Sequence, residues 1–288
     1  MPILTKHRLQ YVLLSLLSLL AVIPFVWLLS TALKASDENI FAYPPHWIPA
    51  KPTFDNFQSV WKQVPLGAFV LNSLVVGALT VVFNLTFSTL AAYPLARMSF
   101  RGEKGIWMVI LSTMMLPFQV IMIPLYLMML HLGLADIAGS YNTGLEASVR
   151  TWLGQVIPFV ISGFGIFFVR DALVSLPRDL EESAVLDGCN SWDILWRILI
   201  PLIRPTLATL AVFSFMASWG EFLWPSILLS EPQHFTLPLG LVQLQSAFSA
   251  NWRLIAAGTT LSMLPIIVFF LLMQRYFVST DVGSGVKG

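Results

Sequence analysis

Charged residues are scarce in this 288-residue chain: they make up 11% of it, whereas hydrophobic residues make up 57%. Soluble domains carry about 25% charged residues. A soluble fold of this length buries only about 75% of the surface of its unfolded chain, and the rest must face water. This composition cannot cover that surface with polar groups, so it excludes a soluble globular protein. We therefore expect an integral membrane protein.

Cysteine is nearly absent as well. Cys189 is the one cysteine, which excludes an intramolecular disulfide and a cysteine-rich metal site. The four histidines lie far apart in the sequence and match no metal-ligand spacing. The formal net charge of +1 argues against a nucleic-acid partner. The sequence thus predicts neither a metal site nor a surface for nucleic acid.

Long apolar runs dominate the chain instead. The first run, residues 11–32, can cross a hydrocarbon core of about 30 Å. It is too long for the apolar region of a cleaved signal peptide, which has about 7–15 residues. Five further runs follow, at residues 66–95, 106–130, 152–169, 206–229 and 254–277. The sequence predicts an all-α polytopic membrane protein in which residues 1–288 form one transmembrane domain with six helices, and lipid surrounds it.

The positions of the basic residues predict the orientation of these spans. With the N-terminus inside, the outer segments hold five of the sixteen basic residues, namely Lys34, Lys51, Lys62, Arg150 and Arg253. The remaining basic residues fall on the inner side, and the positive-inside rule reads this asymmetry as a cytoplasmic N-terminus. Six spans then put both termini in the cytoplasm. The outer loop at 34–65 is expected to be periplasmic, with its tryptophans at the interface.

The least hydrophobic long stretch joins the fourth and fifth predicted spans on the cytoplasmic side. Asp179, Glu181 and Glu182 suit the N-terminus of a short helix. Gly188 can end that helix in the left-handed conformation, and Ser191 is expected to cap a second helix. At helical spacing, this second helix carries Trp192, Leu195, Trp196 and Leu199. Residues 177–200 are therefore expected to fold as helix, glycine turn, helix, with an acidic edge and an apolar face, and Pro201 and Pro205 mark the turn into the fifth span. Composition alone also permits a solvated linker.

The spacing in this segment is similar to a known motif. Glu182-Ser183-Ala184, Gly188 and Ile198-x-Ile200-Pro201 resemble the E-A-A-x3-G-x9-I-x-L-P loop of ABC importer permeases. Ser183 replaces the first alanine of that motif, and Ile200 replaces its leucine.

Four other segments resemble permeases for carbohydrates: residues 71–74 (L-N-S-L), 91–102, 219–225 (W-G-E-F-L-W-P) and 285–288 (G-V-K-G). Over essentially its whole length the chain is similar to the second, six-span permease subunit of the maltose, trehalose, glucosylglycerol and glycerol-3-phosphate importers. Gly220 departs from the asparagine often found at its position in that family.

The resemblance implies a coupling helix between helices 4 and 5 that sits in a cleft of a cytoplasmic ATPase subunit. Glu182 would pair with a basic residue of the ATPase, and Ala184 and Gly188 would allow close approach. The residues that the resemblance assigns to ATPase coupling are Glu181, Glu182, Ser183, Ala184, Asp187, Gly188, Ile198 and Pro201. In the C-terminal tail it assigns ATPase contacts to Thr280, Asp281, Gly283, Ser284 and Gly285.

The chain contains no G-x4-G-K-[S/T] phosphate-binding loop, so it does not bind ATP in that manner itself. The resemblance implies a non-catalytic subunit without a cofactor of its own, with ATP and Mg bound by two partner ATP-binding subunits. It also implies a second permease subunit in a heterodimer and an extracytoplasmic solute-binding protein. The location would be the plasma (inner) membrane of a bacterium or archaeon.

The translocation path is sought among the polar residues of the predicted spans. Glu221 is the only carboxylate deep in an apolar run, where a charge is costly unless it faces a cavity or a partner. A structural hydrogen bond is the alternative role for this side chain. Trp219, Asn72, Asn84 and Gln119 are the other candidates for the path.

The sequence therefore predicts the permease subunit of an ATP-driven, binding-protein-dependent importer that forms half of the pathway for a sugar or related solute. A stand-alone secondary transporter is the alternative, but it usually shows inverted repeats or ionisable groups at the midplane. A membrane-embedded enzyme would need a cluster of titratable residues near one face. The chain shows no convincing repeat, and its histidines are scattered.

Overall fold

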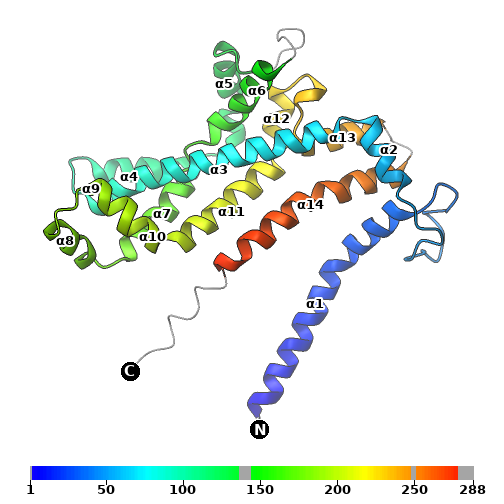
Figure 1. The fold of residues 1–288 in the computed structure, drawn as a ribbon, viewed down its shortest axis with the longest axis horizontal. Coiled ribbons are helices and arrows are strands. Elements are labelled where there is room, and N and C mark those ends of the chain that lie inside the picture. Colours follow the sequence, from blue (N-terminus) through cyan, green and yellow to red (C-terminus); the bar gives the residue numbers. More distant parts are fainter. Residues whose placement is uncertain (1, 136–143, 248–250, 278–288) are drawn as a thin grey trace. The chain divides into compact units, whose positions relative to one another are not determined.

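Every regular element in the described part of the chain is a helix (Figure 1). The computed structural model describes residues 2–135, 144–247 and 251–277. The longer helices are α1 (Pro2–Leu33), α2 (Asp55–Gln63), α3 (Leu66–Arg97), α4 (Glu103–Thr113), α5 (Phe118–His131), α6 (Leu145–Val156), α7 (Gly163–Ser175), α8 (Asp179–Leu186), α11 (Arg204–Gly220), α13 (Leu237–Ala247) and α14 (Trp252–Phe277). The short ones are α9 (Ser191–Asp193), a π-helical turn (Ile194–Leu199), α10 (Ile200–Leu202), α12 (Leu223–Leu228) and two 3₁₀ turns (Ile157–Phe159 and Pro232–His234).

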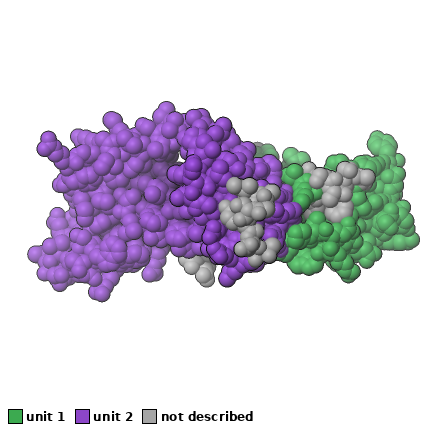
Figure 2. Space-filling model, turned by 90° about the horizontal axis from the view of Figure 1, so that it is seen from above, with its two compact units in different colours: residues 1–67, 240–264 green, residues 68–239, 265–288 purple. Residues whose placement is uncertain are grey.

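The chain divides into two compact units, coloured separately in Figure 2. Unit 1 comprises Met1–Gly67 and Gly240–Leu264, and unit 2 comprises Ala68–Leu239 and Pro265–Gly288. Unit 2 therefore holds most of α3 and all of α4 to α12.

Three helices are each long and apolar enough to cross a membrane, at residues 10–33, 66–97 and 252–272. Three further candidates are pairs of helices that meet at a short break. The first pair, Glu103–Thr113 with Phe118–His131, bends by 98°; the second, Leu145–Phe159 with Gly163–Ser175, by 56°; the third, Ser191–Leu202 with Arg204–Gly220, by 78°. The described residues thus provide three spans, or up to six if each bent pair is one span.

Proline and glycine lie at these breaks. Pro117 precedes α5, Gly163 begins α7 and Pro205 is the second residue of α11. Proline has no backbone N–H to donate and cannot continue a preceding helix. The predicted runs at 106–130 and 152–169 did not anticipate their breaks, since apolarity alone carries no information on a bend. The bend between Leu202 and Arg204 confirms the turn predicted at Pro201 and Pro205. The run at 206–229 is broken again where α11 ends at Gly220 and α12 begins at Leu223.

In unit 1, the loop that follows α1 is tied back onto that helix. Lys34 is fully buried, with its ammonium 4.6 Å from the centroid of the Trp27 ring. The side-chain amide of Asn56 donates to the carbonyl oxygens of Ala32 and Lys34, both at 2.8 Å. Trp47 packs edge-on against Trp27, with 5.1 Å between the ring centroids. These contacts connect the end of α1 to α2 and to the loop between them.

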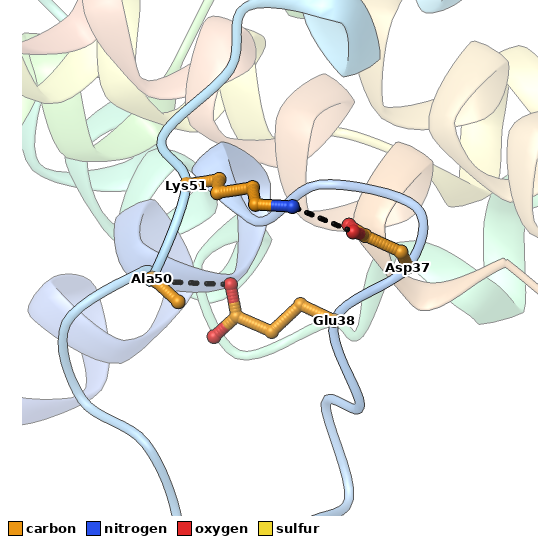
Figure 3. Close-up of polar contacts among 4 residues, drawn as sticks. All are labelled: Asp37, Glu38, Ala50 and Lys51. Carbon is orange, nitrogen blue, oxygen red and sulfur yellow. Dashed lines mark hydrogen bonds and ion pairs between the residues drawn. The ribbon is translucent and has the colours of Figure 1, made fainter.

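A polar cross-link closes the same loop at its exposed side (Figure 3). The Glu38 carboxylate accepts from the backbone N–H of Ala50 at 3.1 Å, and the Lys51 ammonium donates to Asp37 Oδ2 at 3.3 Å. The hydrogen bond from Lys51, together with its charge, lowers the pKa of Asp37. Because that pKa is lowered, the interaction persists at neutral pH and is lost as the pH falls through it.

One core cluster of unit 2 lies where the C-terminal half of α3, α7 and α11 meet the segment around α8. Its fully buried members include Ala92, Val169, Leu173 and Leu199. A second cluster joins α5, α6 and α12 around Trp224, which is fully buried and donates from Nε1 to the carbonyl oxygen of Gly154 at 3.1 Å.

Gly154 is a position where this packing leaves no room for a side chain. A Cβ atom there would collide with the backbone carbonyl oxygen of Leu134 and lie 3.2 Å from Cδ2 of Leu228. We predict that Gly154→Ala lowers the stability of the purified protein by about 1–3 kcal/mol, because the backbone must shift. Thermal unfolding in detergent measures this loss.

Gly105→Ala is the matched control, since it also lies within a helix and a Cβ atom there would meet nothing within 4 Å. That variant should match or exceed the wild-type melting temperature, because replacing a helical glycine by alanine favours the helix. Equal melting temperatures for the two variants would contradict the close approach of α6 to Leu134.

Candidate functional site

Two features of unit 2 stand out. One is the segment at residues 177–200, called here the coupling segment after the role that the sequence resemblance predicts for it, and the other is a cavity between the helices. In the coupling segment, α8 ends at Leu186 and Gly188 has a φ of 84°. The predicted helix and glycine turn are therefore confirmed. The left-handed φ at Gly188 is one that glycine adopts without steric cost.

The predicted N-cap at Ser191 is wrong, since Asn190 takes that role. Its side-chain oxygen accepts from the backbone N–H groups of Trp192 and Asp193, both at 2.9 Å. Asparagine is as good an N-cap as serine because its oxygen reaches the same free N–H groups. Ser191 is instead the first residue of α9.

The coupling segment is anchored to α3 by a shielded ion pair. Arg97 Nε lies 2.7 Å from Glu181 Oε1, and the two side chains are only 4% and 17% exposed. The Arg97 guanidinium also donates to the carbonyl oxygen of Leu176 at 3.0 Å. One arginine at the end of α3 thus holds both the entry to the segment and its first helix.

A second arginine reinforces the same junction from α7. Arg170 donates from Nε to the carbonyl oxygen of Leu95 at 3.0 Å, and its guanidinium lies 4.2 Å from the centroid of the Trp107 ring. Cation–π contacts of this kind contribute about 0.5–2 kcal/mol. The C-terminal end of α3 is therefore fixed to α7 as well as to α8.

The residues predicted for ATPase coupling divide between two faces. Ala184 is buried in the core of unit 2 and Glu181 pairs with Arg97, so these two side chains face the chain's own interior. Ile198 and Pro201 are half-buried. Glu182, Ser183, Asp187 and Gly188 are exposed. The predicted tail residues Thr280, Asp281, Gly283, Ser284 and Gly285 lie outside the described residues.

The exposed face of the coupling segment is also strongly apolar. Leu186 is 89% exposed and Val185 is 60% exposed. Trp192 and Trp196 are exposed too, with their ring centroids 5.8 Å apart. Exposed apolar side chains gathered on one segment mark an interaction surface. The sequence predicted an apolar face on the second helix, and the exposed Trp192 and Trp196 belong to it, whereas Leu195 and Leu199 are buried. The exposure of Val185 and Leu186 was not anticipated.

The second feature is a cavity of about 480 Å³ within unit 2. It lies between α3, α6, α7, α11 and α12. Its volume falls in the range of small-molecule sites, about 300–1,000 Å³. The residues that line it are Val76, Thr80, Asn84, Gln155, Pro158, Phe159, Ile161, Ser162, Phe164, Leu210, Phe213, Ser214, Ala217, Ser218, Glu221, Trp224, Pro225 and Thr236.

Glu221 reaches this cavity from the break between α11 and α12. Its Oε1 accepts from the backbone N–H of Trp224 at 3.1 Å, which caps the start of α12. The Trp224 indole is in turn bonded to α6 through the carbonyl oxygen of Gly154. The carboxylate therefore makes the structural hydrogen bond that the sequence offered as one of its roles, and it also lines the cavity.

The other predicted path residues have different surroundings. Asn84 lines the cavity, where its amide donates to the carbonyl oxygen of Phe159 at 3.2 Å. Asn72 does not line it; its amide donates to the carbonyl oxygens of Gln233 and Phe235. Trp219 is buried in a stack with the Phe215 ring, and Gln119 is exposed on α5. The structure thus brings two of the five predicted residues together.

Sequence reasoning missed six polar residues of the cavity: Thr80, Gln155, Ser162, Ser214, Ser218 and Thr236. Thr80 could have been found, because it precedes Asn84 by four residues and so shares its helix face. Gln155 and Thr236 come from other elements, and only the tertiary fold brings them to α3. Among the described residues, no three His, Cys, Asp or Glu side chains gather as a metal site requires.

Comparison with known proteins identifies the family. The family model described as "Binding-protein-dependent transport system inner membrane component" matches residues 84–280. The chain is 35% identical to the arabinooligosaccharides transport system permease protein AraQ of Bacillus subtilis (strain 168), over 95% of this chain and 93% of that protein. It is 31% identical to the lactose transport system permease protein LacG of Rhizobium radiobacter, over 96% and 94% of the two chains.

A solved structure resembles this fold. It is the crystal structure of a bacterial ABC transporter involved in the import of the acidic polysaccharide alginate, with a TM-score of 0.75 and 25% identity. The match covers 93% of this chain and 95% of that chain. The family match spans well over half of the chain and the similarity to AraQ nearly all of it; the chain therefore belongs to the family of inner membrane components of binding-protein-dependent transport systems.

Proposed function

We propose that this chain is the permease subunit of an ATP-driven, binding-protein-dependent importer and forms half of the pathway for a saccharide. It is a non-catalytic membrane subunit. The observation that carries the proposal is the coupling segment: an exposed apolar and acidic face, anchored through Arg97 to the end of a candidate span. The names of AraQ and LacG supply the substrate class.

The topology that we propose has six spans with both termini in the cytoplasm. Three single helices and three bent pairs support the number of spans, if each bent pair crosses once. The excess of basic residues in the segments assigned to the inner side supports the orientation. In this arrangement the coupling segment lies on the cytoplasmic side, between the span formed by α6 and α7 and the span that contains α11.

The partners that we propose follow from this arrangement. The exposed face of the coupling segment would dock on one of two ATP-binding subunits, with Glu182 next to a basic residue. Val185, Leu186 and Trp192 would fill an apolar cleft beside it. A second permease subunit would complete the pathway, and a solute-binding protein outside the membrane would deliver the saccharide, in line with the description of the family. ATP and Mg would stay on the ATP-binding subunits.

Packed helices connect the coupling segment of unit 2 to its cavity. The cluster of buried residues joins the coupling segment to α3, α7 and α11, and these three helices also line the cavity. A displacement of the coupling segment would therefore also move the helices that line the cavity, because closely packed helices move together as rigid bodies and resist local deformation. Closure of the ATP-binding subunits would thus alternate the access to the pathway.

The proposed docking of Glu182 has a direct test. We expect Glu182→Lys to insert and assemble normally but to lower ATP-dependent saccharide uptake at least about tenfold, because an attractive charge becomes repulsive at a close contact. Uptake by proteoliposomes that contain the whole importer measures the effect. Asp171→Lys, at an exposed acid of α7 outside the coupling segment, is the control and should transport as wild type. Normal uptake by Glu182→Lys would show that this side chain does not contact the ATPase.

Glu181 and Glu182 should differ although they are neighbours. Glu181→Ala leaves Arg97 shielded without its carboxylate, so we expect a loss of about 3–5 kcal/mol in the stability of the folded subunit. Glu182→Ala removes an exposed carboxylate and should leave the melting temperature unchanged while it lowers uptake. Thermal unfolding of the two purified variants separates these roles. Equal melting temperatures would mean that the Arg97 pair does not hold the segment.

A further inference from the structure

Helix Ser191–Leu202 leads from the coupling segment into the proposed span that contains α11, and it is apolar on two faces. Trp196 and Leu202 lie on its outward side and are 47% and 48% exposed. A helix that is apolar on its outward side as well as its inward side needs a second apolar neighbour. The inward side is packed in the core of unit 2 and comprises Ile194, Leu195 and Leu199.

The direction of this helix indicates where the second neighbour lies. Ser191–Leu202 is bent by 78° from Arg204–Gly220 (Figure 1). If Arg204–Gly220 crosses the bilayer along its normal, Ser191–Leu202 lies within about 12° of the membrane plane. Only Ile203 separates the two helices. Ser191–Leu202 is therefore held at the depth where the span leaves the hydrocarbon and meets the lipid headgroups.

The charges on the two sides of the glycine turn differ in sign. The stretch Asp179–Asp187 carries four acidic residues and no basic one. The stretch Ser191–Arg204 carries one acidic residue, Asp193, and two arginines. Asp193 lies 3.3 Å from Arg197, whose side chain is still 78% exposed, and Arg204 is exposed as well. An anionic lipid surface therefore repels α8 and attracts the helix that follows it.

Tryptophan and arginine suit the headgroup level for different reasons. A tryptophan ring packs its apolar body against acyl chains while its N–H group stays near water. An arginine extends its guanidinium toward phosphate groups, which accept its hydrogen bonds. Trp196 and Arg197 place both side chains next to each other. Trp192, which the proposed docking places against the ATP-binding subunit, has its ring centroid 5.8 Å from that of Trp196, so the two surfaces meet at this pair.

We propose that Ser191–Leu202 is an interfacial helix that rests on the cytoplasmic leaflet. Trp196 and Leu202 contact the acyl chains nearest the headgroups, and Arg197 and Arg204 contact anionic phosphate groups. The inference rests on the proposed function, because it needs the span and the cytoplasmic side assigned there. It adds lipid as a partner of the coupling segment: the leaflet holds Ser191–Leu202 while the ATP-binding subunit moves α8.

Spin labels test the lipid contact. Cys189 is the one cysteine and is replaced by alanine, and a nitroxide is attached at Trp196→Cys in the whole importer, in nanodiscs of phosphatidylcholine and phosphatidylglycerol. We expect collisions with oxygen, which concentrates in lipid, to exceed those with a water-soluble nickel chelate at least about threefold. Leu186→Cys is the matched control, because Leu186 is exposed in the same segment but belongs to the proposed docking surface. Its label should be shielded from both reagents.

Two results at Trp196→Cys would overturn the proposal. A label that meets the nickel chelate as often as oxygen would lie in water. A label that is shielded from both reagents, as expected at Leu186→Cys, would lie against a protein subunit.

Lipid charge tests the role of Arg197. We expect Arg197→Gln to lower ATP-dependent saccharide uptake about two- to fivefold in vesicles that contain phosphatidylglycerol and to leave it unchanged in pure phosphatidylcholine, because the attraction needs anionic lipid. Arg178→Gln, at an exposed arginine beside the acidic α8, is the control and should transport as wild type in both vesicles.

The two lipid mixtures separate lipid binding from a structural role. An equal loss of uptake in both would mean that Arg197 acts through its ion pair with Asp193, and would overturn the proposal. If the wild-type importer takes up no saccharide in either mixture, the proposed function is refuted, whereas the spin labels still decide on the interfacial helix.

Discussion

Arg97 is the residue on which the organisation of unit 2 depends. It stands at the end of α3 and contacts the carbonyl oxygen of Leu176 and the carboxylate of Glu181, two groups that follow it by roughly 80 residues of chain. A guanidinium can make both contacts because its charge attracts the carboxylate while one of its N–H groups donates to the carbonyl oxygen. Burying an ion pair contributes little net stability, but removing one partner is costly. The pair therefore serves to fix the position of α8 more than to stabilise the fold.

The two faces of α8 follow from this anchoring. Glu181 points to Arg97 and Ala184 is buried in the core, so the residues between and after them are turned outward. The small side chain of Ala184 lets α8 lie close to the chain's own helices. The apolar side chains of Val185 and Leu186 are exposed in the described structure. An exposed, rigidly positioned apolar surface is what a partner subunit needs in order to bind without first ordering the segment.

The sequence predicted local features well because local rules decide them. Acidic residues at a helix start and a glycine at its end act within one turn, and α8 and Gly188 follow those rules. The cap at Asn190 was misassigned because Ser191 satisfies the same rule one residue later, and only the backbone geometry separates the two. The breaks in the predicted runs were missed for another reason. Apolarity measures whether a segment tolerates lipid, and both halves of a bent pair do.

The cavity was the least predictable part, since its residues come from distant positions. Glu221 and Asn84 were found because a polar residue in an apolar run is conspicuous. Gln155 and Thr236 lie near the ends of helices, where polar residues are ordinary, and only the packing of the helices brings them to the cavity. Asn72 was equally conspicuous, yet it binds two backbone carbonyls of the chain instead. A polar residue within a predicted span is thus informative, but only the fold shows whether its side chain serves a structural or a functional role.

Helix α3 links the two features, because it carries Thr80 and Asn84 at the cavity and Arg97 at the coupling segment. Seventeen residues separate Thr80 from Arg97, which is about 26 Å along a helix at 1.5 Å per residue. A single helix of this length transmits a rigid-body tilt without intermediate contacts. Pro94 lies in its last turn and removes one backbone hydrogen bond there, while Arg170 holds the carbonyl oxygen of Leu95 from α7. The end of α3 thus lacks one of its own backbone hydrogen bonds and is held instead by contacts to α7 and α8. Both α3 and α7 line the cavity.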